Sequence, residues 1–596
     1  MKTTIKALFV LVIILIFSSC FSDWKSEATL TISFGQNGRA AAWISGEEVA
    51  PEVMEKITHK ITLSNGTDVI PLTVVGKGSI TETVAPGSWT VEIDALYDGD
   101  LLFAKGSWKG EVIAGQENHA DVDMKESDDT YTFFTVDSAN EWGNVMELIN
   151  KEPTGKPCVI IVTKDFPANN LMLLVSNIII CGDHTVTLTG TGCLLNIGEE
   201  KTVTMRDVKL KGNGSNNSQA LVMIMGGSFI MEGSASVCDN PGSGVYVYGG
   251  AFTMNGGEIS GNTAGGAGGG VLVLNSGTFT MNGGSISDNK ANAGGGVYLE
   301  NGGKFIMNGG TIGGDGDGDA NTAKYGGGVY VNKGGTFNMI DGKIIRNAAT
   351  EGGGGVYVTA YDILNSIFNM SGGEISGNTV EGGYGGGGVL VIVDEPLSKP
   401  NSLNITFNMS GDAKIINNTV GSGAGGGVFV YGSNATPTSG TGKVTFNMSG
   451  EAVISGNTVG GGSGGGGVCL FYYATFNMNG GTISGNTVGG NNVYGGGVYV
   501  YEKGTFRISN GIIYGSESEI EVGLRNRVVN ADGNPDLNAR GHALRVEQSS
   551  TPGTAKRGIF IDDNMDTWDQ AAEDDLLDNI NYKDNTIRVE NGNIVD

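Results

Sequence analysis

The sequence has few of the residues that build metal and redox sites. It contains six cysteines and four histidines in 596 residues, with no Cys-x-x-Cys spacing. The histidines are His59, His119, His184 and His542, and they form no catalytic or metal-binding motif. Zinc ligation is therefore not indicated. Cys158, Cys181 and Cys193 lie in apolar stretches and are expected to be small buried residues, although a disulfide among them stays open in an exported protein.

Basic residues are also scarce. The chain has 36 Lys and Arg against 63 Asp and Glu, a formal net charge of −27. A surface of this sign repels nucleic acid and anionic lipid headgroups, so DNA or RNA binding is not expected. Long apolar runs are missing after the N-terminal region, and no later segment is long and apolar enough to span a bilayer.

The N-terminal segment carries an export signal. Lys2 and Lys6 precede an apolar run from residue 7 to residue 17, and Ser18-Ser19-Cys20 follows. This pattern is similar to a bacterial lipobox, which implies a signal peptide at 1–19, diacylglyceryl attachment at Cys20 and a lipidated tether at 20–26. Phe17 stands where a lipobox usually has Leu, so a plain secretory signal is the alternative. Phe21 in place of Asp favours the outer membrane over inner-membrane retention.

Glycine, by contrast, is abundant, and it occurs in a repeated phrase. The chain has 102 glycines. A unit of Phe-x-Met, a Gly-rich turn, an Ile, an Asn and a glycine run ending in Val-x-Val recurs nine times. The repeat phenylalanines are Phe252, Phe279, Phe305, Phe337, Phe368, Phe407, Phe446, Phe476 and Phe506. A constant phrase at unequal steps indicates stacked units joined by variable loops.

Within one unit the apolar residues alternate with polar ones. Phe279, Met281 and Ile286 are separated by Thr280 and Ser285, which is strand periodicity. We expect three short strands per unit. A single unit cannot bury its apolar side chains alone, but a column of units can. The sequence therefore predicts an all-β chain whose main body is a right-handed parallel β-helix solenoid.

An asparagine follows the inward Ile in most units. These residues are Asn262, Asn289, Asn347, Asn378, Asn418, Asn457 and Asn486. Asn tolerates left-handed turn conformations and its amide can hydrogen-bond a stacked copy, so we interpret the set as a structural ladder rather than a reactive site.

The repeat phrases carry a family resemblance. Phe-Thr-Met-Asn at 252 and 279 and Phe-Asn-Met-Asn at 476, each followed by Gly-Gly-Gly-Val, resemble the repeats of polymorphic outer membrane proteins. More broadly, residues from about 130 to 515 look like bacterial pectate-lyase-fold β-helix repeat proteins, here with a lipoprotein signal. The resemblance implies the fold, but that fold carries adhesins, lyases and glycosidases alike, so it does not fix the activity.

The segments outside the repeats suggest further domains. Residues 27–126 alternate apolar and polar residues between turn signals, which predicts an antiparallel β-sandwich; the phrase around Trp89 resembles transthyretin-like or carboxypeptidase-regulatory-like modules. A capping box at Ser138 and Glu141 predicts a helix near 138–150 that caps a β-helix spanning 127–520. Residues 521–596 lose the glycine phrase and are expected to form a C-terminal cap.

Carboxylates are missing from the face where a polysaccharide lyase of this fold would need them. The outward position between Phe and Met holds Thr253, Thr280, Ile306, Asn338, Asn369, Asn408, Asn447, Asn477 and Arg507. Asp412 and Glu451 occupy matching positions on adjacent units, but both mark a one-residue insertion and suit a solvated turn. We therefore do not expect an enzyme, and assign no catalytic residue.

Two candidate ligand sites remain. Asp315, Asp317 and Asp319 alternate as calcium ligands could, although Ala320 and Gly326 depart from an EF-hand, and a solvated acidic loop is the simpler interpretation. We expect no cofactor other than this possible calcium ion. On the third strand, the outward residues Tyr298, Tyr330, Tyr357, Phe429 and Tyr499 would form an aromatic stripe able to bind sugar rings or protein partners, or simply to stack between units.

These features predict a lipid-anchored cell-surface β-helix protein that acts in adhesion or cell-envelope interaction. Its partners would be the membrane, through the N-terminal lipid, and carbohydrate or protein on host or neighbouring cells, with no nucleic acid. The bacterial outer membrane, with the repeats exposed, is the expected location; the periplasmic face or secretion is the alternative. A carbohydrate-active enzyme and a passive structural coat are the competing functions.

Overall fold

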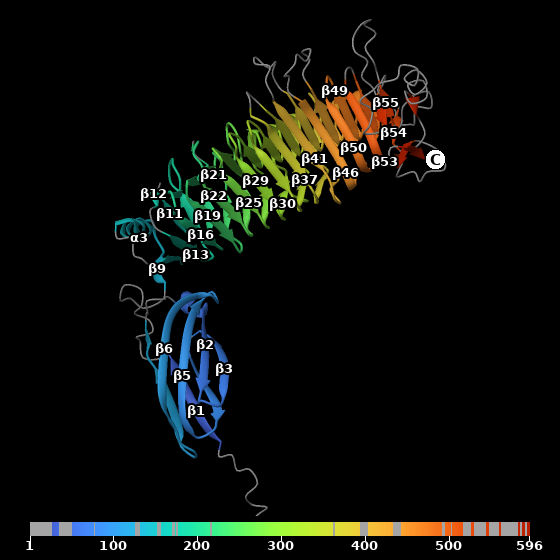
Figure 1. Cartoon of the computed structure of the whole chain (residues 1–596). Helices are drawn as coiled ribbons and strands as arrows, with labels where there is room; N and C mark the ends of the chain where they lie inside the picture. The colour runs from blue at the N-terminus through green and yellow to red at the C-terminus, as the bar shows by residue number, and fades with distance from the viewer. Residues whose placement is uncertain are drawn as a thin grey trace, which may run out of the picture. The chain divides into compact units, whose positions relative to one another are not determined.

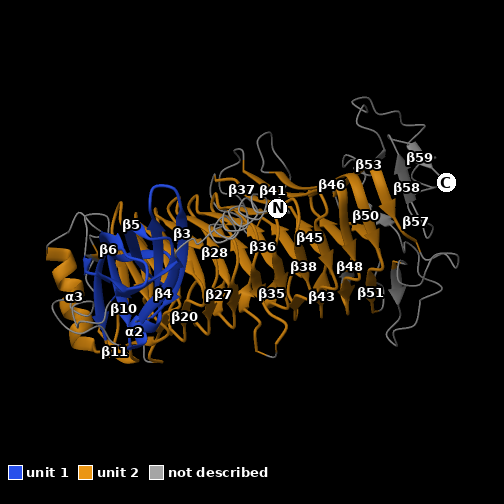
Figure 2. Ribbon diagram, turned by 90° about the horizontal axis from the view of Figure 1, so that it is seen from below, with its two compact units in different colours: residues 1–136, 154–163 blue, residues 137–153, 164–596 orange. Residues whose placement is uncertain are grey.

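The computed structural model divides into two compact units, residues 1–136 with 154–163 and residues 137–153 with 164–596 (Figure 2). It describes residues 27–34, 51–76, 78–125, 131–151, 157–169, 173–174, 177–214, 217–316, 318–360, 364–393, 403–432, 443–490, 495–501, 504–515, 526–529, 544–546, 559–561, 582–583, 587–590 and 593–595. The predicted lipidation site Cys20, the signal peptide and Asp317 lie outside these residues.

The first unit contains the expected N-terminal sheet domain. A five-stranded antiparallel sheet has the order β3-β2-β5-β6-β8, and a three-stranded sheet has the order β4-β1-β7, in which β1 runs parallel to β7. The elements are β1 (Ala28–Phe34), α2 (Pro51–Glu55), β2 (Ile57–Ser64), β3 (Val69–Val75), β4 (Gly78–Val84), β5 (Gly87–Tyr97), β6 (Leu101–Val112), β7 (Glu117–Val122), β8 (Met124–Lys125), β9 (Thr132–Val136) and β10 (Cys158–Val162).

The core of this domain follows from period-two alternation in its strands. Leu30, Ile32 and Phe34 of β1 are buried, as are Trp89 and other alternate residues of β5. The Trp89 indole Nε1 donates a hydrogen bond to the Ala85 carbonyl oxygen at 2.8 Å, so the buried ring keeps its polar group satisfied.

The second unit is a right-handed parallel β-helix, whose strands stack in successive coils (Figure 1). One set of strands carries the Phe-x-Met phrase: β19 (Ser228–Glu232), β22 (Ala251–Met254), β25 (Thr278–Met281), β29 (Lys304–Met307), β33 (Thr336–Met339), β37 (Ser366–Met370), β41 (Asn404–Met409), β46 (Lys443–Ser455), β50 (Thr475–Ser484) and β53 (Thr505–Ile513). The next set carries the inward Ile: β23 (Glu258–Ser260), β26 (Ser285–Ser287), β30 (Thr311–Gly313), β34 (Lys343–Ile345), β38 (Glu374–Ser376) and β42 (Lys414–Ile416).

The Val-x-Val segments form a 14-stranded sheet, called here the Val sheet. Its strands are β12 (Leu173–Leu174), β15 (Leu195–Ile197), β18 (Val222–Met225), β21 (Val245–Tyr248), β24 (Val271–Leu274), β28 (Val297–Leu299), β32 (Val329–Val331), β36 (Val356–Thr359), β40 (Val389–Ile392), β45 (Val428–Tyr431), β49 (Val468–Phe471), β52 (Val498–Val500), β55 (Leu544–Val546) and β57 (Tyr582–Lys583).

The coils contain one more strand than the three we expected. The segment between the Asn and the glycine run forms an eight-stranded sheet, called here the side sheet. Its strands are β27 (Lys290–Ala293), β31 (Thr322–Tyr325), β35 (Ala348–Gly352), β39 (Thr379–Val380), β43 (Thr419–Val420), β47 (Thr458–Val459), β51 (Thr487–Gly489) and β54 (Arg527–Val529). Ala349, Val380 and Val420 are buried along it, so it has a small core of its own.

The earliest and last coils are less regular. Strands β11 (Phe166–Ala168), β13 (Ile178–Cys181), β14 (Thr185–Leu188), β16 (Thr202–Arg206), β17 (Lys209–Lys211) and β20 (Ser236–Cys238) continue the parallel stack toward the N-terminus. Near the C-terminus lie β56 (Ile559–Ile561), β58 (Ile587–Glu590) and β59 (Asn593–Val595). In the middle coils, the short strand β44 (Gly423–Ala424) pairs with β48 (Gly462–Gly464). β53 pairs parallel with β56 through its first half and antiparallel with β58 through its second half.

The phenylalanine column predicted from the repeats is present. Phe279, Phe305 and Phe337 have exposed fractions of 0%, and consecutive ring centroids lie 4.7 Å apart with interplanar angles of 3° and 5°. The spacing equals the distance between neighbouring strands, so strands in register place each ring on its copy in the next coil.

The asparagine ladder is also present, and longer than expected. Each side-chain amide donates to the amide oxygen of the next coil: the Asn289 Nδ2 to Asn321 Oδ1 distance is 2.9 Å. Asn321 was missed because the acidic loop displaces it from the regular spacing. The left-handed conformation falls on the preceding residue, as at Asp288 (φ 53°) and Gly377 (φ 63°), and not on the ladder asparagines as we expected.

The helix α3 (Ala139–Lys151) begins at the predicted capping box. The Glu141 amide lies 3.4 Å from Ser138 Oγ, and the Glu141 carboxylate accepts a hydrogen bond from the Asp137 amide at 2.9 Å. Its buried face includes Trp142, whose ring centroid lies 6.0 Å from that of Phe166 on β11.

The cysteines of the described residues form no disulfide, and Cys158, Cys181, Cys193, Cys238 and Cys469 are all buried. The prediction that Cys158, Cys181 and Cys193 are small buried residues is confirmed, and the disulfide alternative is wrong. Burial raises the pKa of the Cys193 and Cys238 thiols to about 11, which keeps them protonated and unreactive.

Candidate functional site

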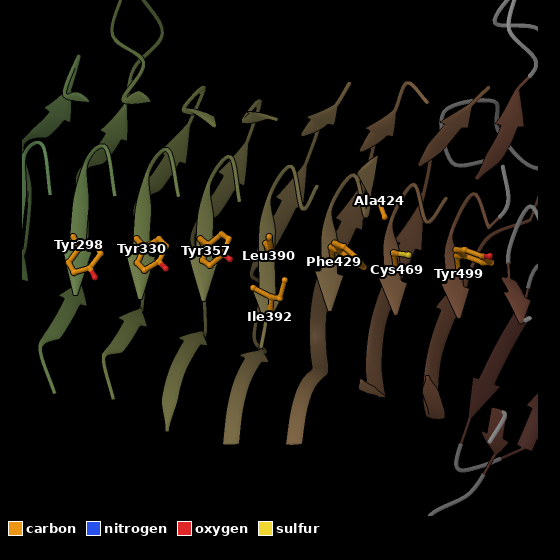
Figure 3. Close-up of a cluster of buried hydrophobic side chains, with 9 residues drawn as sticks. All are labelled: Tyr298, Tyr330, Tyr357, Leu390, Ile392, Ala424, Phe429, Cys469 and Tyr499. Atoms are coloured by element: carbon orange, nitrogen blue, oxygen red, sulfur yellow. The ribbon is translucent and has the colours of Figure 1, made fainter. Parts of the chain in front are cut away.

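The predicted aromatic stripe exists as a column, but it is covered. Tyr298, Tyr330 and Tyr357 stack on consecutive strands with ring centroids 5.0 and 4.8 Å apart (Figure 3). Their exposed fractions are only 9, 7 and 0%, and those of Phe429 and Tyr499 are 2 and 3%. The prediction of an accessible stripe at these positions is therefore wrong.

The side sheet and the neighbouring two-stranded sheet β44–β48 explain this burial. Ala293 of β27, Tyr325 of β31 and Ala424 of β44 pack against the column, which lies on the outward face of the Val sheet. The rings of Tyr325 and Tyr357 meet edge to face at 5.3 Å. The outward side of the Val sheet thus becomes a second buried layer. Burial raises the pKa of Tyr298 to about 12.

Accessible aromatic rings occur near the buried column, three of them two residues beyond it along the chain. Outward positions recur every second residue, so the last residues of β45 and β49 point the same way as the buried column. We call the following residues the aromatic patch: Tyr384, Tyr431, Phe471, Tyr472 and Tyr501. Tyr384 is 37% exposed and the other four are half-buried. The alternation was the signal that could have identified Tyr431, Phe471 and Tyr501, whereas Tyr384 and Tyr472 lie in turns.

The rings of the patch have a definite arrangement. Tyr431, Phe471 and Tyr501 come from successive coils, with centroids 6.2 and 4.7 Å apart and tilts of 36° and 39°. Tyr472 is close to perpendicular to all three, at 73°, 88° and 82° and at 5.3, 5.8 and 6.1 Å. Tyr472 therefore packs in edge-to-face contacts with three rings from three different coils.

The backbone under Tyr472 is strained. Tyr472 and Tyr473 have φ values of 45° and 56°. The same two turn positions hold Asn275 and Ser276 in an earlier coil, and Asn301 and Gly302 in the next, residue types that tolerate this conformation more readily. A left-handed conformation costs about 1–2 kcal/mol per residue for a side chain of this kind. Lys333 (φ 39°) shows that a long side chain also occurs at the first of these positions, but two adjacent tyrosines in this conformation occur at Tyr472 and Tyr473 among the described residues.

A second feature is a groove of 460 Å³ at the turn between the Phe-x-Met and Ile strands. It crosses four coils and is lined by Gly309, Gly310, Thr311, Asp341, Gly342, Lys343, Gly373, Glu374, Asp412 and Lys414. Its floor is glycine for a steric reason. A Cβ at Gly342 would lie 2.6 Å from the Met307 ε-methyl, and Gly342 has φ 103°. The core methionine therefore sets the depth of the groove.

The groove carries charges of both signs. Lys343, Glu374 and Lys414 stand in register on neighbouring strands, so a carboxylate lies between two ammonium groups along the wall. Glu374 accepts a hydrogen bond from Ser376 Oγ at 2.5 Å. Sequence reasoning placed Asp412 on a turn but missed Glu374, because it considered only the face of the Phe-x-Met strands.

That face holds an uncharged amide ladder. The Asn369 Nδ2 donates to Asn338 Oδ1 at 2.8 Å, and the Asn408 Nδ2 donates to Asn369 Oδ1 at 2.8 Å. These amides are half-buried and satisfy one another, so they stabilise the stack, and an amide side chain does not supply an acid or a base.

The acidic loop is partly described. Asp315 lies 3.4 Å from Arg346, and Asp319 accepts a hydrogen bond from the Gly316 amide at 2.8 Å. Burial, together with the neighbouring carboxylates of Asp239 and Asp319, raises the pKa of Asp288. Among the described residues no group of three or more His, Cys, Asp or Glu could hold a metal ion. Asp317 is outside them, so calcium binding stays a prediction.

In the part of the chain that the structure describes, no helix is long and apolar enough to cross a membrane. Comparisons with protein-family models, curated proteins and solved structures found nothing that matches this chain. The evidence for function is therefore the geometry above.

Proposed function

We propose that this protein is a lipid-anchored β-helix of the bacterial outer membrane that acts in adhesion or cell-envelope interaction. The observation that carries the proposal is the aromatic patch, because a cluster of partly exposed rings on a rigid scaffold is typical of a contact surface. The lipobox-like segment ending at Cys20 supplies the anchor in this proposal.

The scaffold suits this role. In-register stacking of Phe and Asn columns gives a stiff body, and the net charge of −27 keeps an exported protein soluble. The face that β-helix lyases use for catalysis carries a self-satisfied amide ladder here, which supports binding over bond cleavage.

The test compares intact cells with and without this protein. Brief protease treatment of intact cells is expected to cleave the repeats, and loss of the protein is expected to reduce attachment to host or neighbouring-cell material. Repeats that are protected on intact cells, or attachment that is independent of the protein, would refute the proposal and favour a periplasmic or coat role.

One observation supports a second candidate, a carbohydrate-active enzyme. The carboxylates of Glu374, Asp341 and Asp412 all line the charged groove. Paired carboxylates perform the acid and base steps of glycoside hydrolysis. If this function is correct, the purified protein cleaves a polysaccharide and Glu374→Gln lowers the rate at least about a hundredfold. No cleavage across a polysaccharide panel would remove this candidate.

A further inference from the structure

Within the proposed contact function, on which this inference rests, the geometry points to a neutral saccharide as the ligand of the aromatic patch, with Tyr472 as the ring against which a sugar stacks. The first argument is the orientation of that ring. Three neighbouring rings lie at 73°, 88° and 82° to Tyr472, and Tyr472 is half-buried, so part of its ring is accessible beside this cluster. The face of an aromatic ring carries partial negative charge and attracts the C–H groups on the apolar side of a pyranose.

The second argument is the backbone under Tyr472. Two adjacent tyrosines occupy left-handed positions, φ 45° and 56°, that Asn275 and Ser276 occupy in an equivalent turn. A turn that only had to connect two strands would be more stable with residues such as Asn or Gly. Strained side chains that persist where unstrained ones fit are typical of ligand contacts.

The third argument is size. An aromatic side chain has about 150–250 Å² of surface, and most of each patch ring is covered, so the open area is on the order of 300 Å². A stable protein interface needs about 800 Å² per partner. The patch is thus too small for a protein partner by itself, but it accommodates one or two sugar rings.

The fourth argument is charge. The chain carries −27, and the rings of the patch offer faces and phenol groups rather than cations. An acidic polysaccharide would be repelled by the overall field, whereas a neutral glycan would not. Perpendicular ring contacts with Tyr431, Phe471 and Tyr501 hold Tyr472 in place, so the stacking surface is preorganised.

The test measures binding of the purified chain to cellohexaose, chitohexaose, xylohexaose and mannohexaose by isothermal titration calorimetry, with hexagalacturonate as the acidic probe. We expect saturable binding of at least one neutral oligosaccharide and none of hexagalacturonate. Tyr472→Asn, which places at this turn the residue found at Asn275, should weaken binding at least about tenfold. Tyr472→Phe keeps the ring and should stay within about threefold of the wild type.

The matched control is Tyr248→Asn, because Tyr248 is a 40% exposed tyrosine at the end of β21 and lies outside the patch. It should bind like the wild type. Thermal unfolding of Tyr472→Asn should match the wild type within a few degrees, since relief of backbone strain offsets the lost ring contacts. If Tyr472→Asn is folded and binds normally, or if no neutral probe binds, the saccharide inference is wrong.

The outcome is separable from that of the proposed function. If cells attach through this protein but no neutral probe binds, the contact function stands and the saccharide assignment fails. If a neutral probe binds through Tyr472 but cells lacking the protein attach normally, the saccharide assignment stands and the adhesion proposal fails.

Discussion

Asn378 and Asn418 lie in consecutive coils, both fully buried, and the amide nitrogen of Asn378 donates to the amide oxygen of Asn418 at 2.9 Å. The same nitrogen also donates to the Ile344 carbonyl oxygen at 2.9 Å, and the Asn378 oxygen accepts from the Asn347 amide nitrogen at 3.0 Å. One fully buried side chain thus ties three coils together.

Asn378→Ala should therefore destabilise the β-helix strongly. It leaves donors and acceptors on its neighbours buried and unpaired, at about 1–3 kcal/mol for each group, so a total of about 3 kcal/mol or more is expected. Asn369→Ala is the matched control, because Asn369 belongs to the half-buried outward ladder where water replaces the lost bonds. Denaturant titration of both variants checks this. Equal destabilisation would contradict the distinction between the two ladders.

Phe407 tests the apolar core in the same way. Its ring lies 4.7 Å from Phe368 and 4.8 Å from Phe446 and has an exposed fraction of 0%. Phe407→Ala should cost about 3–5 kcal/mol through lost burial and the cavity left behind. Thr406→Ala, one residue away on the outward face, should change the free energy of unfolding by less than about 1 kcal/mol. Similar values for the two would mean that the strand faces are assigned wrongly.

His59 predicts a pH dependence for the N-terminal domain. Burial lowers its pKa from 6.5 to about 4, while backbone groups of Val74 and Gly76 partly oppose this shift. Between pH 6.5 and 4 the unfolded chain binds the extra proton and the folded domain does not, so stability is full above pH 6.5 and falls as the pH is lowered toward 4. The loss is on the order of 3 kcal/mol.

The measurement is thermal unfolding of the full chain from pH 7.5 to 4, compared with His59→Gln. This variant should flatten the pH dependence of the N-terminal transition over that range. A transition temperature that is equally pH-dependent in both proteins would assign the effect to carboxylates instead.

Calcium binding at the acidic loop can be decided by ion removal. If Asp315, Asp317 and Asp319 bind calcium, 1 mM calcium should raise the melting temperature relative to chelator-treated protein, since a ligand that binds only the folded state stabilises it. Asp319→Asn should abolish this rise. Magnesium provides the ion control, because it prefers octahedral sites that keep bound water. An identical melting temperature with calcium and with chelator would remove calcium from the description of this protein.

Lipidation at Cys20 has a separate test. Cys20→Ala should release the protein from membranes into the soluble fraction, because a lipidated cysteine is the expected anchor. The wild type should partition into the detergent phase and carry a diacylglyceryl group by mass spectrometry. Detergent partition that persists in Cys20→Ala would identify the apolar run before it as an uncleaved anchor.

The sequence was sufficient for the scaffold. Phe, Met, Ile, Val and Asn recur at fixed positions of each unit, and the parallel register of a solenoid converts each recurrence into a column. The fold class, the Phe column and the buried Asn ladder could therefore be predicted from periodicity alone. So could the helix α3, because its capping residues are local signals.

Only the tertiary structure decided which outward residues are accessible. Tyr298 and Tyr357 alternate with inward valines, and alternation gives the face of a strand but not what lies over it. The side sheet covers them, and it is built by residues such as Ala293 and Tyr325 whose pairing depends on neighbouring coils. The same is true of Tyr472. Its left-handed backbone conformation and its perpendicular packing against rings from other coils depend on the three-dimensional structure, and the spacing of residues in the sequence does not give them.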